Sequence, residues 1–169
     1  IEERIRRMKV LDWLVNNAGF GLGKPFLQHS EEELEEVVLV NMVRPLQLII
    51  RLVRYMPRGG VVVNVITSGV HLMLRNLPSY GAAKMGLYYA SRILREELRD
   101  RGIHLVDVFP SATKTEFFQR VGVDTPSFTV SPERVAEDII KAVEKKRKTV
   151  YTPFFLKALS VFGPLPFKV

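Results

Sequence analysis

The chain has 169 residues, and its 25 lysines and arginines against 18 aspartates and glutamates give a formal net charge of +7. Hydrophobic residues make up 47% and charged residues 25% of the chain, a globular composition that excludes extensive disorder and a collagen-like repeat. The sequence contains no cysteine, which excludes disulfides, thiol catalysis and zinc–thiolate sites.

The sequence carries no apolar run of the roughly 18–20 residues that a membrane-spanning helix needs. It opens on the charged segment Ile1-Glu-Glu-Arg4, which does not resemble a secretory signal peptide. We therefore expect a cytoplasmic protein and, because residue 1 is not methionine, one that belongs to a longer product. Its three histidines are too far apart in the sequence to form a local metal motif, so we expect no metal site.

The excess positive charge is spread along predicted helices or gathered in residues 145–148, near a helix end where cations suit the helix dipole. Aromatic side chains do not alternate with these charges, as they would on a surface that stacks nucleic-acid bases. We interpret the charge as solvated helix faces and expect no nucleic-acid binding. Binding to nucleic acid or to an anionic membrane surface is the alternative.

Helices and strands alternate along the first half of the chain. Ser30 and Glu33 form a capping box, and the apolar residues behind them keep helical spacing as far as Met56. Residues 61–66 are β-branched and apolar on both faces, which is typical of a central parallel strand. The predicted elements are a helical segment over 1–8, a strand over 11–15, a helix over 30–56 and a strand over 61–66.

The same alternation continues in the second half. Gly102 is expected to end one helix, and Ser131 followed by Pro132 is expected to begin another. The predicted elements are a helix over 79–101, a strand over 103–109, a helix over 132–147, a short strand over 149–151 and an apolar C-terminal tail over 153–169. The pattern predicts a single α/β domain over 1–169 with a parallel sheet and helices on both faces.

Polar residues follow three of the predicted strands, at the edge of a parallel sheet where ligands bind. Close to them, Tyr80 and Lys84 are four residues apart and share one helix face, about 5–6 Å apart at Cβ. An ammonium there would lower the tyrosine pKa from its ordinary value near ~10, so that the phenol could exchange a proton with a carbonyl or alcohol oxygen. The alternative is a pair that simply faces solvent.

Five segments in this order and at these spacings resemble the short-chain dehydrogenase/reductase family, and the resemblance runs from residue 1 to about 150. The segments are Asn16-Asn-Ala-Gly19, Asn41, Asn64-Val-Ile-Thr-Ser68, Tyr80-Gly-Ala-Ala-Lys84 and Pro110-Ser-Ala-Thr-Lys-Thr115. The resemblance implies the C-terminal part of a doubly wound, Rossmann-like α/β fold. It also implies an oxidoreductase that moves hydride between NAD or NADP and a small-molecule carbonyl or secondary alcohol.

The resemblance also implies roles for single residues. Tyr80 would be the general acid/base, and Lys84 would bind the nicotinamide ribose and lower the tyrosine pKa. A strand-end hydroxyl would bond the substrate oxygen. Asn41 would hold a relay water through its backbone carbonyl. The cofactor contacts would be Asn17, Ala18, Gly19, Tyr80, Lys84, Pro110, Thr113 and Thr115.

Pro45 supports the role of Asn41 on independent grounds. Proline has no N–H, and the N–H at position 45 is the one that an α-helix would donate to the carbonyl of Asn41. A buried free carbonyl needs another partner, and a relay water would serve. The alternative is an ordinary proline kink with a water of no catalytic importance.

Three features depart from the family pattern. The early glycine-rich unit that binds the cofactor phosphates is not found, and Gly19-Phe-Gly-Leu-Gly23 cannot replace it because no helix opens directly behind it. We therefore expect this unit upstream of Ile1. The catalytic hydroxyl is Thr67 by spacing and Ser68 by residue type, and the sequence leaves both open. Ser111 replaces a glycine that the family has after Pro110.

The two long predicted helices carry outward apolar residues, among them Tyr88, Tyr89 and Ile93, which predicts a homodimer or tetramer. The apolar tail could close over a lipophilic substrate, join an oligomer interface or make peripheral contact with a membrane surface. The competing function is a non-catalytic fragment or oligomerisation partner that cannot bind the dinucleotide.

Overall fold

The computed structural model describes residue 3 and residues 10–162 of the chain. The predicted helix over residues 1–8 therefore lies outside the described residues, apart from the helical Glu3. Residues 163–169, the end of the predicted tail, lie outside them as well.

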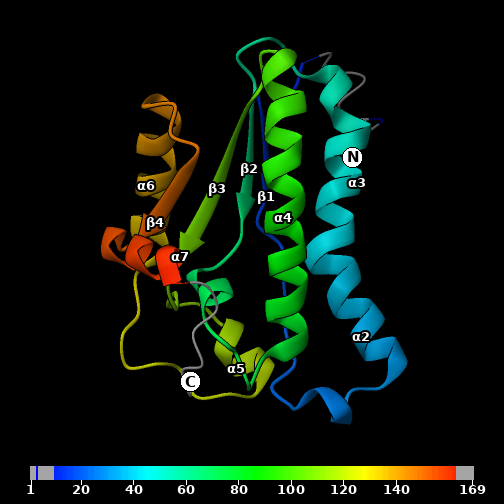
Figure 1. Ribbon diagram of the computed structural model, residues 1–169, viewed down its shortest axis with the longest axis vertical. Helices are drawn as coiled ribbons and strands as arrows, with labels where there is room; N and C mark the ends of the chain where they lie inside the picture. The colour runs from blue at the N-terminus through cyan, green and yellow to red at the C-terminus, as the bar shows by residue number, and fades with distance from the viewer. Residues whose placement is uncertain (1–2, 4–9, 163–169) are drawn as a thin grey trace.

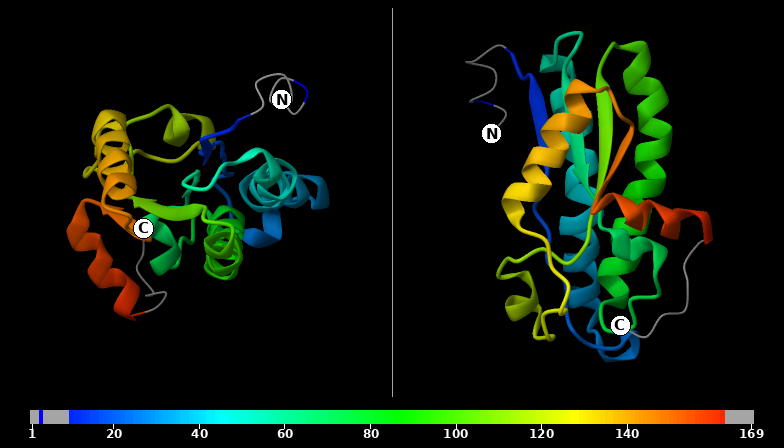
Figure 2. Two further views of the ribbon diagram at one scale, coloured as in Figure 1. Left: turned by 90° about the horizontal axis from the view of Figure 1, so that it is seen from above. Right: turned by 90° about the vertical axis from the view of Figure 1, so that its left-hand side faces the viewer.

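Four parallel strands form one sheet in the order β1-β2-β3-β4, so that each strand pairs with the next one along the chain. The strands are β1 (Trp13–Asn16), β2 (Val61–Val65), β3 (His104–Pro110) and β4 (Thr149–Thr152). Figures 1 and 2 show the connecting helices on both faces of the sheet, with α4 on one face and α6 on the other. The predicted α/β fold with a parallel sheet is confirmed, and each strand lies within two residues of its predicted bounds.

The helix predicted over residues 30–56 is one rod made of several segments. The capping box of Ser30 and Glu33 begins it as predicted. In its middle the N–H of Arg44 donates to the carbonyl of Leu39, one residue further back than in an α-helix. Pro45, which cannot donate a hydrogen bond, directly follows this slip. The segments are α2 (Glu31–Val38), the π-helix η2 (Leu39–Val43), α3 (Arg44–Leu52) and the 3-10 helix η3 (Val53–Tyr55).

The second long helix, α4 (Pro78–Asp100), agrees with its prediction to within one residue at either end. Gly102 follows it with a φ of +73°, a left-handed backbone that favours glycine. The helix α6 (Pro132–Glu144) begins as predicted, but ends before residue 147 because the chain turns at Lys146, whose φ is +50°. The short helix α5 (Phe117–Val121), which packs below the sheet in Figure 1, was not predicted.

Apolar side chains cover both faces of the sheet. Val62 of β2 packs under α3 and α4, and its neighbour Val63 packs on the opposite face under α6. Both valines are completely buried, which confirms the prediction of a central strand. The prediction that Tyr88 points outward from α4 is wrong. Its ring packs edge-on against Phe109 in the core, with the ring centroids 5.0 Å apart. Tyr89, about 100° further round the helix, is 69% exposed.

The described part of the tail forms the 3-10 helix η5 (Phe154–Ala158) and the short helix α7 (Leu159–Phe162). Phe154 and Val161 are strongly exposed, whereas Leu156 packs against the core. Among the residues that the structure describes, no helix is both long enough and apolar enough to cross a membrane.

A row of buried polar side chains crosses the sheet under α4. Asn16, Asn64 and Asp107 are register partners on β1, β2 and β3. Asn16 donates to Asn64 at 2.8 Å, and Asn64 donates to Ser91 of α4 at 2.7 Å. Asp107 forms an ion pair with Arg95, which is also on α4. These bonds fix α4, the helix of Tyr80 and Lys84, against three strands.

Replacing Arg95 by methionine is expected to lower the free energy of unfolding by about 3 kcal/mol near neutral pH, because it leaves a buried charge without its partner. Asp107 is 0% exposed, and its burial raises its pKa from 3.8 to about 6 in spite of the arginine. The raised pKa favours the neutral acid in the folded state, so this group lowers the stability of the fold as the pH rises from 3.8 to about 6, and its contribution is level above that. At about pH 5 the folded carboxyl is mostly neutral and depends less on the arginine than the carboxylate at about pH 8. The loss in the variant should therefore be smaller at about pH 5 than at about pH 8.

Urea unfolding at both pH values measures this loss. The matched control is Arg92→Met, which removes an exposed arginine of the same helix and should change stability by less than about 0.5 kcal/mol. Equal losses for the two variants, or a loss that does not depend on pH, would contradict a stabilising role of the buried pair.

Candidate active site

The predicted site residues gather at the carboxyl end of the sheet, where the strands point in Figure 1 and where α4 begins. The loop after β1 brings Gly19 against two side chains from other elements. A Cβ placed on Gly19 would lie 2.7 Å from Oδ1 of Asn41 and 3.3 Å from Nζ of Lys84. A larger residue would clash there, so glycine at this position lets the backbone approach both polar atoms.

Lys84 is held in a fixed position at the centre of this group. Its side chain is buried, with 2% exposed, and its Nζ donates to the carbonyl of Val65 at the end of β2, at 2.9 Å. Burial lowers the pKa of Lys84 from 10.5 to about 8. A lysine in this state carries a readily exchanged proton near neutral pH.

Tyr80 lies one turn before Lys84, with its ring enclosed by neighbours. The ring packs on Phe117 of α5 at a centroid distance of 5.2 Å, and a Cβ on Gly21 would lie 3.2 Å from Cβ of Tyr80. Nζ of Lys84 lies over the tyrosine ring, 5.8 Å from its centroid.

The expected lowering of the tyrosine pKa is wrong for this structure. Burial raises the pKa of Tyr80 above its ordinary value, because the apolar surroundings disfavour a phenolate. Lys84 does not offset this effect, since its ammonium bonds Val65 and its own pKa is lowered by burial. The phenol therefore holds its proton, as a proton donor requires.

Asn41 lies in the π-helix η2 and is completely buried. Its amide nitrogen donates to the carbonyls of Phe20 at 2.7 Å and Val37 at 2.8 Å. Its Oδ1 has no hydrogen-bond partner among the described residues, and it faces the same space as Lys84 Nζ above Gly19. A buried amide oxygen without a partner is unfavourable, so this space suits a water or another donor. The sequence indicated the backbone carbonyl of Asn41 and missed the side chain.

The two candidate hydroxyls follow β2 directly. The Thr67 hydroxyl accepts the N–H of Gly69 at 3.1 Å and thereby caps the 3-10 helix η4 (Ser68–His71). Thr67 is partly exposed, whereas Ser68 is 6% exposed. The accepting bond leaves the threonine proton free to donate to another oxygen.

The other residues that the sequence predicts as cofactor contacts lie in the loops that follow β1 and β3. Asn17 and Ala18 are exposed directly after β1. Pro110 ends β3, and beyond it Thr113 donates its hydroxyl to the carbonyl of Ser111 at 3.1 Å. Thr115 accepts the N–H of Phe117, the first residue of α5, at 3.3 Å. These two threonines hold the turn that leads from the sheet edge into α5.

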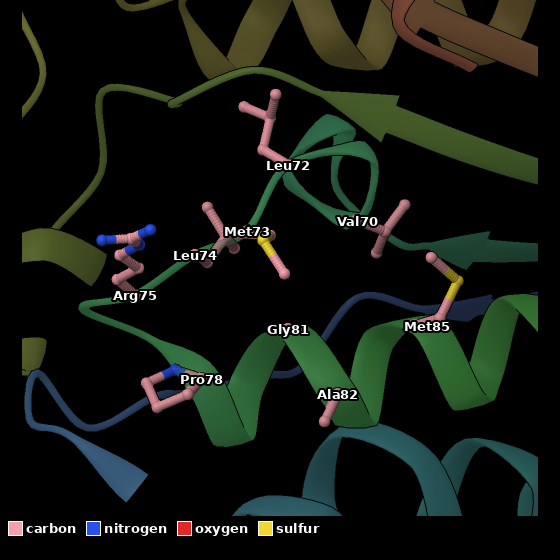
Figure 3. A pocket seen from close by; sticks show the side chains of 9 residues that line it. All are labelled: Val70, Leu72, Met73, Leu74, Arg75, Pro78, Gly81, Ala82 and Met85. Atoms are coloured by element: carbon pink, nitrogen blue, oxygen red, sulfur yellow. The ribbon is translucent and has the colours of Figure 1, made fainter. Parts of the chain in front are cut away.

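A cavity of about 440 Å³ lies beside α4, between this helix and the loop after η4 (Figure 3). The stripe of α4 that borders it is turned by roughly a third of a turn from Tyr80 and Lys84. The cavity and the space above Gly19 therefore border different stripes of α4. The lining of the cavity is apolar apart from one arginine and consists of Val70, Leu72, Met73, Leu74, Arg75, Pro78, Gly81, Ala82 and Met85.

Comparison with known proteins gives one consistent answer. A family model described as short chain dehydrogenase matches residues 1–125. The probable oxidoreductase EphD of Mycobacterium tuberculosis is 28% identical over 91% of this chain, which spans 29% of that protein.

Solved structures agree with this match. A short-chain dehydrogenase from Sphingobium yanoikuyae in complex with NADPH superposes with a TM-score of 0.82 at 25% identity, covering 95% of this chain and 66% of that one. A short chain dehydrogenase/reductase from Burkholderia phymatum in complex with NAD gives a TM-score of 0.81 at 16% identity, over 95% of this chain and 70% of that one. The matched residues include the whole candidate site, and the chain belongs to the short-chain dehydrogenase family.

Proposed function

We propose that this chain carries the catalytic centre of an NAD- or NADP-dependent oxidoreductase that interconverts a small-molecule carbonyl compound and a secondary alcohol. The observation that carries the proposal is the convergence of Lys84, Asn41 and Gly19 on one space beside Tyr80. Three unconnected segments supply these groups, and two of the polar atoms are buried. The family relationship and the two nucleotide complexes support the proposal.

The residues fit a nicotinamide ribose at this place. Gly19 has no side chain to block the approach and Lys84 Nζ offers a donor, while Asn41 Oδ1 is left as the acceptor for a water. In the proposed site, Asn17, Ala18 and Gly19 border the cofactor on one side, and Pro110, Thr113 and Thr115 border it on the other. When bound, the reduced nicotinamide supplies a hydride to the carbonyl carbon.

The proton for the carbonyl oxygen comes from Tyr80 in this proposal. Its pKa is raised in the free protein, so the phenol is protonated at neutral pH and can act as the acid during reduction. Lys84 then stabilises the phenolate that forms. A water between Lys84 and Asn41 Oδ1 would return a proton to the site, since this oxygen lacks a partner among the described residues.

We assign the strand-end hydroxyl to Thr67, because its side chain is accessible and its proton is free to donate. Thr67→Val should lower kcat/KM by about 10²-fold by removing a donor to the developing oxyanion. Thr67→Ser should restore most of the activity, and Ser68→Ala should change it less than about twofold.

NADPH consumption with a panel of ketones and aldehydes measures these ratios in the full-length gene product that carries this chain. A large loss in Ser68→Ala together with an active Thr67→Val would instead assign the role to Ser68.

A second candidate function is that of a non-catalytic oligomerisation partner. It is favoured by the apolar side chains that α3 and α4 expose, among which Ile50 is 71% and Tyr89 is 69% exposed. The same surface would join the subunits of an active homodimer or tetramer. A protein that forms oligomers in sedimentation but consumes no NADPH or NADH would favour this candidate over the enzyme, and a monomer in sedimentation would contradict it.

A further inference from the structure

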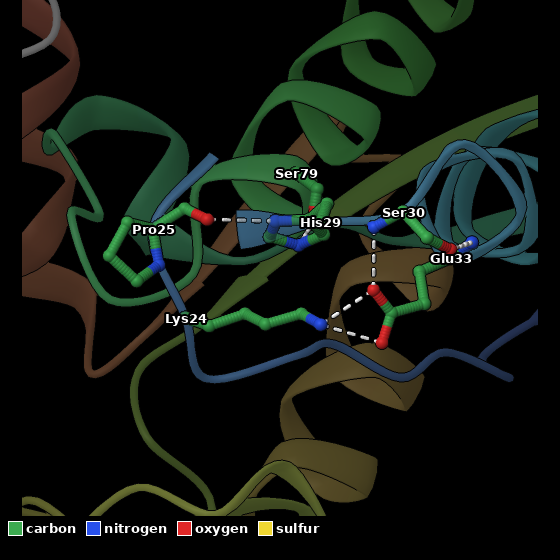
Figure 4. Close-up of polar contacts among 6 residues, drawn as sticks. All are labelled: Lys24, Pro25, His29, Ser30, Glu33 and Ser79. Atoms are coloured by element: carbon green, nitrogen blue, oxygen red, sulfur yellow. Dashed lines mark hydrogen bonds and ion pairs between the residues drawn. The ribbon is translucent and has the colours of Figure 1, made fainter. Parts of the chain in front are cut away.

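The loop between β1 and α2 reaches across to the first turn of α4 (Figure 4). Nε2 of His29 in this loop lies 2.9 Å from Oγ of Ser79. Ser79 is 0% exposed and directly precedes Tyr80 in α4. One hydrogen bond therefore joins a surface loop to the backbone that carries the tyrosine.

The direction of this bond follows from the other ring nitrogen of His29. Nδ1 lies 3.0 Å from the carbonyl oxygen of Pro25, which can only accept. Nδ1 therefore carries the proton, and in the neutral ring Nε2 accepts from the Ser79 hydroxyl. The buried hydroxyl of Ser79 thus has a defined acceptor.

The loop that presents His29 is itself anchored. Lys24 forms an ion pair with Glu33, with Nζ 2.5 and 2.6 Å from the two carboxylate oxygens. The same glutamate accepts the N–H of Ser30 at 2.8 Å in the capping box of α2. Figure 4 shows the two contacts meeting at the Glu33 carboxylate, and Ser30, which takes part in one of them, directly follows His29 in the chain. His29 is therefore attached to α2 on one side and to α4 on the other.

The first turn of α4 has no side-chain cap of its own. Leu77 occupies the N-cap position without forming a side-chain hydrogen bond, and Pro78 has no N–H. The ends of helices open more easily than their interiors, and Tyr80 lies in this end turn. The bond from Ser79 to His29 therefore restrains the first turn of α4, the part of the helix that opens most easily.

We propose that His29 is a positioning residue for Tyr80: by bonding Ser79, it holds the first turn of α4 and keeps the phenol in place for proton transfer. This inference rests on the proposed function. Loss of the bond should lower kcat about tenfold, because small displacements of a proton donor reduce rates strongly. KM should change less than about twofold, since His29 does not touch the proposed cofactor or substrate groups.

The experiment compares four variants in the full-length gene product with NADPH or NADH and a reducible ketone. His29→Phe keeps a ring but removes the acceptor, and Ser79→Ala removes the donor. Each should lower kcat about tenfold, and the double variant should lose no more than either single one, because both remove the same bond. His29→Gln should restore most of the activity, since its amide can reach the serine.

Hydrogen exchange of the backbone amides over residues 79–83 provides a readout that does not depend on activity. Exchange should become faster in His29→Phe and stay unchanged in the matched control His104→Phe. His104 bonds the carbonyl of Arg147 at 3.0 Å and begins β3, at the amino end of the strand and away from the candidate site.

Unchanged kcat in His29→Phe, in an enzyme whose wild type is active, would overturn this inference and leave the proposed function standing. A faster exchange with unchanged kcat would also overturn it, since the bond would then be structural only. A wild type that reduces no carbonyl compound with either NADPH or NADH would overturn the proposed function and this inference with it.

Discussion

Tyr80→Phe is expected to lower kcat by about 10³-fold, since it removes the only atom of this side chain that can exchange a proton. The phenyl ring keeps the packing of Tyr80 on Phe117 and Gly21, so the fold should be retained. NADPH consumption with a ketone measures the effect, with a thermal unfolding curve to confirm that the variant is folded.

The matched control is Tyr89→Phe, which removes a hydroxyl from an exposed tyrosine on the same helix. This variant should keep its activity within about twofold of the wild type. If Tyr80→Phe retained more than a tenth of the activity, the phenol would not be the acid, and the assignment of the site would be wrong.

Lys84→Met is expected to lower kcat/KM about 10²-fold and at the same time to make the protein more stable. The rate falls because the variant loses the cation that stabilises the phenolate and binds the ribose in the proposed site. Stability rises because folding buries an amine whose pKa falls from 10.5 to about 8. That change corresponds to about 3 kcal/mol against the charged amine in the folded state.

The net gain in the free energy of unfolding should be about 1 kcal/mol near pH 7, since the variant also leaves the Val65 carbonyl without its donor. For a base with a lowered pKa, the penalty on folding is full below pH 8 and is absent above 10.5. The gain should therefore disappear at strongly alkaline pH. Urea unfolding and NADPH kinetics on the same samples measure both effects.

Lys84→Arg serves as the control, because it keeps a cation but makes it bulkier. If Lys84→Met were both less active and less stable than the wild type, Lys84 would not be a functional group that opposes folding. The wild-type rate should fall above about pH 8 as Lys84 loses its proton, and this fall should be absent from Lys84→Met.

The elements of the fold were predictable because their signals are local. The capping box of Ser30, the β-branched run over 61–66 and Gly102 each act within a few residues, and the structure contains all three features. The short helix α5 carries too few residues to show a periodic pattern. The π-turn before Pro45 depends on how a missing donor is accommodated, which the sequence cannot specify alone.

The candidate site was predictable only in part. The spacing of Tyr80 and Lys84 placed them on one helix face, but their pKa values depend on burial, which is set by Val65, Phe117 and the rest of the fold. The bond between His29 and Ser79 joins residues separated by 50 positions, and no local signal marks it. The free Oδ1 of Asn41 likewise becomes visible only when all its neighbours are in place.

The most direct test of the catalytic assignment follows a labelled hydride. NADPH in which both hydrogens at C4 of the nicotinamide are replaced by deuterium is mixed with the full-length gene product and a panel of ketones, and the alcohols formed are analysed by mass spectrometry. The account predicts deuterium on the carbinol carbon with the wild-type protein and almost none with Tyr80→Phe. Transfer at the same rate by the Tyr80→Phe protein, or no transfer to any ketone by a wild type that binds NADPH, would contradict it.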